Sequence, residues 1–254
     1  MNHISNILEY PFASTPDPGE TIEVAPGVHW LRMPLPMSLN HINLYLVEGD
    51  QDWTIVDTGI RGEETSELWK QIFADRLGDK PVGQIICTHM HPDHTGQAGF
   101  LSDYWRAPLL MSYSEYYQAR VMGSMMQEGG SWHMSDFFIR AGVTMETLEA
   151  MRDMRSSFTP SADDTPLPKS YLRLSEGDTL KIGANEWEII VGTGHSPEHV
   201  CLYCKELRVF ISGDQILPVI TSNVSVHPTE PLANPLLGWM NSHLKLMALI
   251  PDDT

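Results

Sequence analysis

One short stretch limits what this chain can fold into more than any other. Three histidines and one aspartate lie within six positions, from His89 to His94, and Gly96 follows them. An apolar run at residues 84–87 leads directly into this cluster. Imidazole and carboxylate groups are the usual protein ligands of zinc and related divalent metals. The pattern therefore predicts a buried strand that ends in a metal-binding loop; the alternative is a surface loop that happens to be rich in histidine.

The spacing within this loop suggests two binding points. Side chains alternate between the two faces of extended backbone, so His89 and His91 are expected to point the same way. Pro92 then ends the extended segment and turns the chain. Asp93 and His94 can therefore face a second point beside the first, so that a single loop could contribute ligands to two metals.

Length and charge narrow the class of protein. The chain has 254 residues, 42% of them hydrophobic, which fits one large α/β domain or two small ones. Asp and Glu total 33 against 16 Lys and Arg, for a formal net charge of -17. Because such a surface repels phosphate backbones, we expect no nucleic-acid partner.

The cysteines and the apolar runs predict the compartment. Cys87, Cys201 and Cys204 form a sparse, odd set that suits a reducing environment. Residues 201 and 204 lie three apart on an expected strand and so point to opposite faces, which argues against a shared zinc or redox role. The first residues do not resemble a secretory signal, and no apolar run reaches 18 residues. We expect a cytoplasmic protein with no membrane partner; these features do not determine the oligomeric state.

Strands and helices are expected in three blocks. The first contains short apolar runs separated by turns, typical of antiparallel strands, at residues 21–24, 28–33, 43–47 and 53–56. Helical patterns follow at residues 62–77 and from His94 or Thr95 toward Tyr104. The last block returns to strand patterns and ends in a helix, at residues 171–174, 179–182, 186–191, 200–204, 208–211 and 236–249.

A segment rich in methionine and aromatic residues separates these blocks, at residues 112–158. Helical spacing is visible at residues 114–127, 135–141 and 144–156, with glycines between them. Stripes of this kind usually form ordinary helical packing. Methionine also adapts to irregular apolar ligands. We interpret the segment as a helical insertion that covers the site, and contact with substrate is an open alternative.

Polar candidates follow four of the expected strands: Asp57, the loop from His89 to His94, His195 and Asp214. A catalytic zinc takes about three protein ligands and keeps one position open. His89, His91 and His195 would supply one such set, although His195 alone could be a buried structural residue. Asp214 could bridge this set to a second one begun by the rest of the loop. Asp57 could act at the site or cap the helix that follows it.

These residues bring a family resemblance into view. The segments VDTG, THMHPDHTG, GTGHSPEH and ISGD occur in this order between residues 56 and 214. In this order they resemble the metallo-β-lactamase superfamily of metallohydrolases, in its broad glyoxalase II-like branch. The resemblance implies an α/β fold, a four-layer αββα sandwich of two mixed β-sheets with the metals at one edge. It implies one domain over residues 1–254, including the helical insertion at about 112–158.

The resemblance also implies the role of each candidate. One metal would be held by His89, His91 and His195. A second would be held by Asp93, His94 and Asp214, with Asp214 bridging the two ions. Asp57 would stand behind the ligands and orient the metal loop. Two Zn²⁺ ions are expected, and the same ligands accept iron or manganese.

The C-terminus departs from the family pattern. Members usually carry a further histidine on a strand after the last helix, as a ligand of the second metal. Here the helix is expected to end near residue 250, four residues before the chain stops. His227 lies in a proline-rich loop and His243 lies within the helix, and we expect neither to be that ligand. A truncated C-terminus and an under-ligated second metal are therefore expected.

The expected reaction is hydrolysis. A metal-bound hydroxide would attack the carbonyl of a small-molecule acyl substrate, with Asp93 as the catalytic residue that orients the nucleophile. Thioesters are favoured and lactones or carboxylic esters come next, whereas β-lactams and nucleic acids are disfavoured. Two alternatives come from other classes: an oxidoreductase with one iron that resembles the persulfide dioxygenases, and a non-catalytic metal-binding protein.

Overall fold

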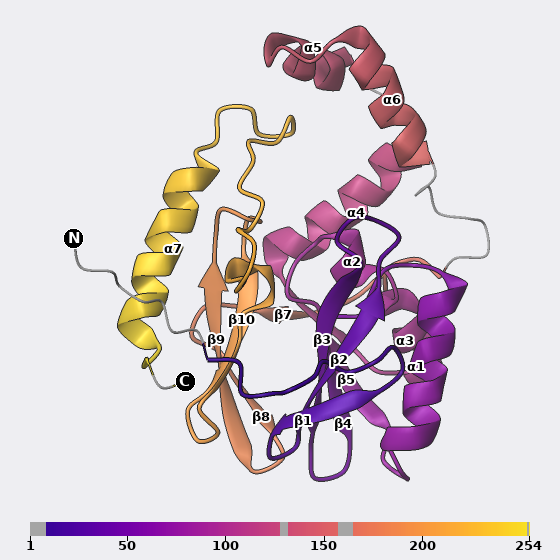
Figure 1. Cartoon of the computed structure of the whole chain (residues 1–254), viewed down its shortest axis with the longest axis vertical. Coiled ribbons are helices and arrows are strands. Elements are labelled where there is room, and N and C mark those ends of the chain that lie inside the picture. Colours follow the sequence, from indigo (N-terminus) through magenta and orange to yellow (C-terminus); the bar gives the residue numbers. More distant parts are fainter. Residues whose placement is uncertain (1–8, 128–131, 157–164, 253) are drawn as a thin grey trace.

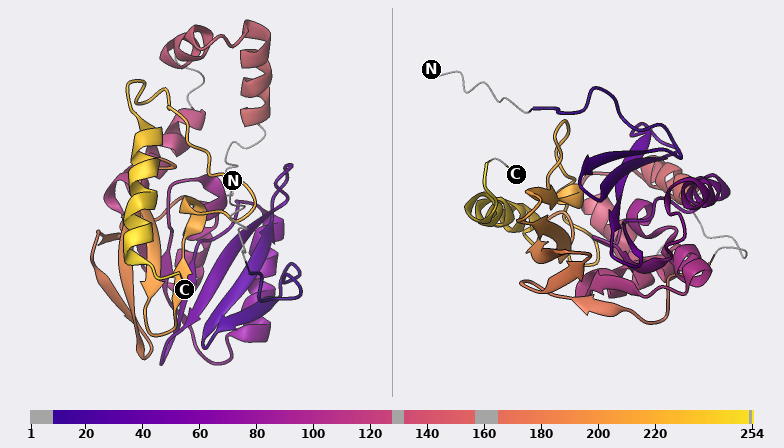
Figure 2. Two further views of the ribbon diagram at one scale, coloured as in Figure 1. Left: turned by 60° about the vertical axis from the view of Figure 1, so that its left-hand side comes forward. Right: turned by 90° about the horizontal axis from the view of Figure 1, so that it is seen from below.

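Two β-sheets face each other with helices on their outer sides (Figures 1 and 2). The computed structural model describes residues 9–127, 132–156, 165–252 and 254. Helices α1 and α3 lie outside the larger sheet and α7 lies outside the smaller one. This arrangement confirms the predicted four-layer αββα sandwich.

The larger sheet combines antiparallel and parallel strands. β1 to β4 pair antiparallel and β4 to β7 pair parallel. The change falls where helices replace hairpins, because parallel neighbours need a crossover connection. The strands lie in sequence order: β1 (Thr21–Ala25), β2 (Val28–Pro34), β3 (His41–Glu48), β4 (Trp53–Val56), β5 (Val82–Ile86), β6 (Leu109–Ser112) and β7 (Leu172–Leu174). The crossovers contain α1 (Glu63–Arg76), α2 (Pro92–Thr95) and α3 (Ala98–Trp105).

The smaller sheet differs from the expectation of two mixed sheets. Its described strands lie in the order β11-β10-β9-β8, and every pair is antiparallel. The physical reason is that short turns, which allow only antiparallel pairing, connect these strands. They are β8 (Thr179–Ile182), β9 (Asn185–Gly192), β10 (His199–Cys204) and β11 (Val209–Ile211), and α7 (Pro235–Leu249) packs against β9.

The core between the sheets is apolar and fully enclosed. Val56, Ile86 and Leu110 from the larger sheet meet Trp187 and Leu202 from the smaller one. Each such side chain stabilises the fold by about 1.5–3 kcal/mol through removal of apolar surface from water. The sheets are therefore held together directly behind the strand ends that carry the candidate site.

A second apolar layer fixes α1 against the outer face of the larger sheet. Trp69, Ile72 and Phe73 of α1 pack there and are buried. The indole Nε1–H of Trp69 donates to the carbonyl of Thr58 at 2.8 Å. This hydrogen bond ties α1 to the backbone next to Asp57.

One backbone hydrogen bond joins the two sheets at the edge where the site lies. The N–H of Val200, on β10, donates to the carbonyl of Thr88, just after β5, at 2.8 Å. Both residues are fully buried. The loop that follows β5 is thus bonded directly to the smaller sheet.

The cysteines are buried and free, as expected of a sparse set. Cys201 packs in the cluster that contains Leu246 of α7, whereas Cys204 packs in the core between the sheets. The prediction that the two point to opposite faces of the strand is confirmed.

The segment between β6 and β7 forms an arm. It contains α4 (Tyr113–Gln127), α5 (Trp132–Arg140) and α6 (Met145–Ser156), within the predicted range of 112–158. α4 packs against β6, while α5 and α6 pack on each other and extend outward from the sandwich (Figure 1). None of the α5 residues is buried. The expected cover is therefore a projecting arm rooted beside the site.

No helix in the described part of the chain is long and apolar enough to span a membrane.

Candidate metal centre

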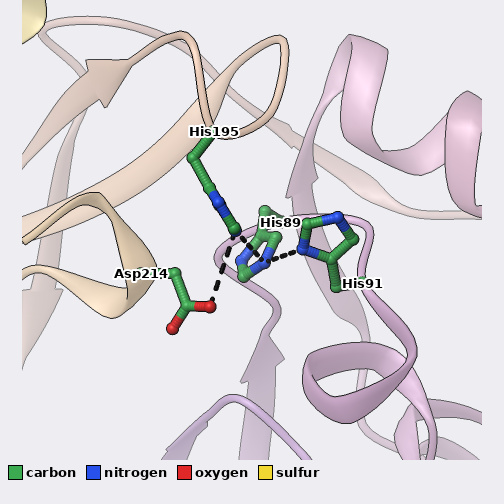
Figure 3. Close-up of side chains that lie close together, drawn as sticks. All are labelled: His89, His91, His195 and Asp214. Atoms are coloured by element: carbon green, nitrogen blue, oxygen red, sulfur yellow. Dashed lines mark hydrogen bonds and ion pairs between the residues drawn. The ribbon is translucent and has the colours of Figure 1, made fainter. Parts of the chain in front are cut away.

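Four predicted ligands converge at one edge of the sandwich (Figure 3). His89 and His91 lie in the loop after β5, His195 in the loop between β9 and β10, and Asp214 in the short 3₁₀ helix η1 (Gly213–Gln215) after β11. One ligand atom from each can be chosen so that all lie within 4.8 Å of one another. Nε2 of His89 lies 2.8 Å from Nδ1 of His91 and 3.1 Å from Nε2 of His195. Both sheets therefore contribute to one cluster of donors.

The imidazoles of this cluster favour the neutral form. Burial lowers the pKa of His89 well below its ordinary value, and neighbouring histidines lower it further. Burial, with a contribution from His195, lowers the pKa of His91 to about 3. The pKa of His195 is also lowered by burial, although Asp214 opposes the change. Neutral imidazole is the form that binds a metal, so the cluster is electrostatically ready for a cation.

A second set of groups surrounds the ring of His94. Nδ1 of His94 lies 2.8 Å from Oδ2 of Asp57. Nε2 of the same ring lies 3.5 Å from Asp214 Oδ1 and 3.8 Å from Asp93 Oδ2. This Nε2 is buried, and these two long ion pairs are its contacts in place of a well-formed hydrogen bond. A buried polar atom of this kind is expected to have a partner, and a metal ion beside the two carboxylates would supply it.

Electrostatics at this second point favour positive charge. Burial lowers the pKa of His94, but Asp57, Asp214 and Asp93 outweigh burial and raise it well above the ordinary value. Burial raises the pKa of Asp214, but His94 and His195 overcome this effect and hold it below its usual range. The carboxylates that hold a proton on His94 would equally hold a divalent cation. The donors at both points thus fit metal binding.

Asp57 lies behind the metal loop. Its backbone adopts a left-handed conformation with φ of 62°, which aspartate tolerates better than most residues. Oδ1 accepts from the N–H of Thr88 at 2.7 Å, and the Thr88 hydroxyl bonds the same carboxylate. The helix-cap alternative is wrong, because Gly62 occupies the N-cap of α1 and no side chain caps it.

The structure places the remaining candidates outside the four-residue cluster. Among the described residues that cluster contains neither Asp93 nor His94, which lie at the second point. It also lacks His227, whose Nδ1 lies 2.8 Å from the hydroxyl of Thr229, and His243, whose ring packs 4.1 Å from that of Trp239.

Sequence reasoning missed His199. This residue is fully buried, and its ring stacks on that of His89 with centroids 4.7 Å apart. Its Nε2 accepts from the backbone N–H of Asp214 at 3.1 Å. Burial lowers its pKa to about 3, which keeps the ring neutral and able to accept. Its position four residues after His195, at the start of a buried strand, was the available signal.

Sequence reasoning also missed Glu115, in the first turn of α4. The side chain is fully buried beside the metal loop. An acidic residue in the first turn is normally explained by the helix dipole, so the sequence carries no distinctive signal for it.

Comparison with known proteins identifies the family. The model of the metallo-beta-lactamase superfamily matches residues 38–254, and the chain belongs to this superfamily. The predicted resemblance is confirmed, and with it membership in a superfamily of metallo-hydrolases that bind metal ions.

Individual similar proteins share between 23% and 43% of their aligned residues with this chain. A β-lactamase domain protein from Burkholderia ambifaria has a similar structure, with TM-score 0.84 and 43% identity, covering 96% of this chain and 70% of that one. The probable metallo-hydrolase YqjP of Bacillus subtilis is 25% identical over 228 residues, 87% of this chain and 68% of that protein. The human acyl-coenzyme A thioesterase MBLAC2 is 23% identical over 202 residues, 75% of this chain and 63% of that protein. The chain thus spans about two thirds of the length of these curated relatives.

Proposed function

We propose that this protein is a metal-dependent hydrolase of small acyl compounds, with thioesters preferred and lactones or carboxylic esters next. The observation that carries the proposal is the convergence of His89, His91 and His195 with Asp214. Beside this cluster, the buried Nε2 of His94 faces two carboxylates without a well-formed hydrogen bond. This combination of neutral imidazoles and carboxylates, at an edge shared by two sheets, matches the chemistry of a hydrolytic metal centre.

The ligand assignment follows the two points of the site. His89, His91 and His195 would hold one ion, and the second would lie among Asp93, His94 and Asp214. Zinc is the favoured metal, with iron or manganese as substitutes. A divalent ion at this site would supply a Lewis acid and lower the pKa of a bound water to about 7.

The protein's own groups divide the remaining tasks. The side chain of Asp93 is 24% exposed, and its carboxylate faces Nε2 of His94 at the second point. There it can orient a water molecule and accept a proton from that water. The buried thiols do not compete as nucleophiles, because burial raises the pKa of Cys87 and Cys201 and keeps both protonated. Asp93 is therefore the residue to which we assign proton transfer.

Exposed apolar side chains on segments at the same end of the sandwich as the site support an acyl substrate. The loop between β2 and β3 exposes Met37 and Leu39, and the segment that follows Asp214 exposes Val219 and Ile220. Both segments lie at the same end of the sandwich as α2 (Figure 1). The net charge of -17 disfavours phosphate-rich polymers, and the similarity to an acyl-coenzyme A thioesterase adds support for a thioester.

The free thiols support a reducing compartment, and we propose the cytoplasm.

A substrate panel tests the proposal. The metal-loaded protein would be assayed with an acyl thioester, a lactone, a β-lactam and a phosphodiester. We expect the highest kcat/KM on the thioester, and loss of both metal and turnover in His89→Ala. Activity on the phosphodiester alone would contradict acyl hydrolysis, and unchanged metal content in His89→Ala would contradict the assignment of the site.

One observation favours a second candidate, an iron-dependent oxygenase. The compact cluster offers three imidazoles and one carboxylate around a single point, and two of these imidazoles with the carboxylate form a set that also suits non-haem iron. Metal analysis and oxygen uptake separate the two functions. Bound iron with thiol-dependent oxygen consumption would replace the hydrolase proposal, whereas tight metal binding with no turnover on any substrate would favour a binding protein.

A further inference from the structure

A buried glutamate connects the two loops that carry the candidate ligands. Oε2 of Glu115 accepts from the N–H of Met90 at 2.9 Å, and Oε1 accepts from the N–H of Glu198 at 2.7 Å. Met90 lies between two histidines of the first loop, and Glu198 lies three residues after His195 in the second. A single carboxylate thus bridges loops that are more than 100 residues apart in the chain.

The connection is reciprocal. Oε2 of Glu198 accepts from the N–H of Ser114, at the start of α4, at 2.7 Å. The hydroxyl of Ser112 donates to the carbonyl of Glu198 at 2.6 Å. Each glutamate therefore binds backbone on the other's segment, and the root of α4 is locked to the loop that carries His195.

Chemistry explains why a carboxylate is needed here. Burial raises the pKa of Glu115 to about 7, so the charged form is costly. The Ser196 hydroxyl and the two backbone N–H donors favour the charged form. Because the two backbone donors bond different oxygens, two acceptor oxygens are required to satisfy them. Glutamine offers one acceptor oxygen and one donor NH₂, so it could satisfy only one of the two.

We propose that Glu115 is a positioning residue of the metal centre. It sets the distance between the loop of His89 and His91 and the loop of His195. Because it belongs to α4, it also couples the root of the helical arm to the metal ligands. The inference rests on the metal site of the proposed function and is independent of its substrate.

Cobalt binding tests the inference without any substrate. Metal-free Glu115→Gln would be titrated with Co²⁺ while visible absorption bands are recorded, and its thermal unfolding would be measured without metal. We expect Co²⁺ affinity to fall about 10- to 100-fold, as for residues that support ligands, with altered bands. We expect Glu115→Asp, which keeps two acceptors on a shorter side chain, to recover part of the affinity.

A matched control separates positioning from general stability. Thr54→Val removes a buried hydroxyl that accepts a hydrogen bond from Nε2 of Gln84. Thr54 lies on β4 and Gln84 on β5, so this bond lies within the larger sheet. We expect this variant to be destabilised but to bind Co²⁺ with unchanged affinity and bands.

Wild-type Co²⁺ affinity and bands in Glu115→Gln would overturn the inference, and so would equal losses of affinity in the variant and the control. If Glu115→Gln fails to fold, the Glu115→Asp titration decides by the same criteria. If the wild-type protein binds Co²⁺ and the variants behave as expected, but no thioester is hydrolysed, that result would count against the proposed function alone.

Discussion

Nδ1 of His94 lies 2.8 Å from Oδ2 of Asp57, and both side chains are almost completely buried. The carboxylate keeps a proton on Nδ1, which directs Nε2 of the ring toward Asp214 and Asp93. The same carboxylate accepts from the backbone N–H of Thr88, so one side chain fixes both the loop after β5 and the orientation of the candidate ligand His94.

We expect Asp57→Asn to lose the second metal while keeping the fold. Asparagine tolerates the left-handed backbone at this position. Its NH₂ group would face Nδ1 of His94 and favour the tautomer with the proton on Nε2, which blocks that atom as a ligand. Metal content after dialysis should fall from two ions to one. Two ions bound at wild-type affinity would contradict this role for Asp57.

We expect His195→Ala to lower the metal affinity of the first site by at least about 10-fold. The reason is that His195 is the only imidazole of the four-residue cluster that the smaller sheet contributes. His29→Ala is the matched control, because His29 lies on β2 and packs against Trp53, away from the cluster. Competition with a chelator measures both variants. Equal affinities in both would remove His195 from the ligand set.

We expect the metal-free protein to lose stability as the pH falls from about 6.5 toward 3. The folded protein keeps His91 and His199 neutral, with pKa values of about 3, whereas the unfolded chain takes up these protons near the ordinary value of 6.5. The unfolded state then binds more protons, so each histidine lowers the free energy of unfolding by about 1.4 kcal/mol per pH unit. His89 acts in the same direction.

Glu115 opposes this trend between its ordinary value of 4.5 and about 7, because its pKa is raised in the folded state. The three histidines outweigh the single carboxyl. Urea unfolding at several pH values measures the slope, and His91→Gln should make it shallower. A flat profile, or an unchanged slope in His91→Gln, would contradict the neutral buried imidazoles.

We expect Met37→Ser to discriminate among acyl chain lengths. Met37 is 47% exposed in the loop between β2 and β3, so its loss should leave stability within about 0.5 kcal/mol. KM for a long-chain thioester should rise about three- to tenfold, while a short-chain substrate is unaffected. Leu244→Ser, at an exposed position on α7, is the control. Equal effects at both chain lengths would exclude Met37 from the acyl site.

Local pattern was sufficient for much of the fold and the site. Alternating or continuous apolar runs predicted strands such as β4 and β5 because their neighbours in the sheet require those faces to be apolar. Polar residues at strand ends predicted where candidate ligands such as His89 and Asp214 would lie. These signals are local, so they can be read in the sequence.

The contribution of Glu115 and His199 depends on contacts between distant segments. Glu115 has the spacing of an ordinary residue in a helix, and only the approach of Glu198 reveals its role. The direction of the α5 and α6 arm was equally hidden, because an apolar stripe does not specify what it packs against. The antiparallel pairing of the smaller sheet depends on the short turns between its strands more than on the composition of the strands.

The backbone bond from Val200 to Thr88 makes assembly of the centre observable without metal or substrate. The Val200 amide is buried in the seam between the two halves of the molecule. We expect its hydrogen to exchange for deuterium when the bond to Thr88 breaks, and we expect the same opening to separate His195 from His89. The exchange rate of the Val200 amide therefore reports the separation of His195 from His89. A metal ion bound to both histidines should slow this exchange.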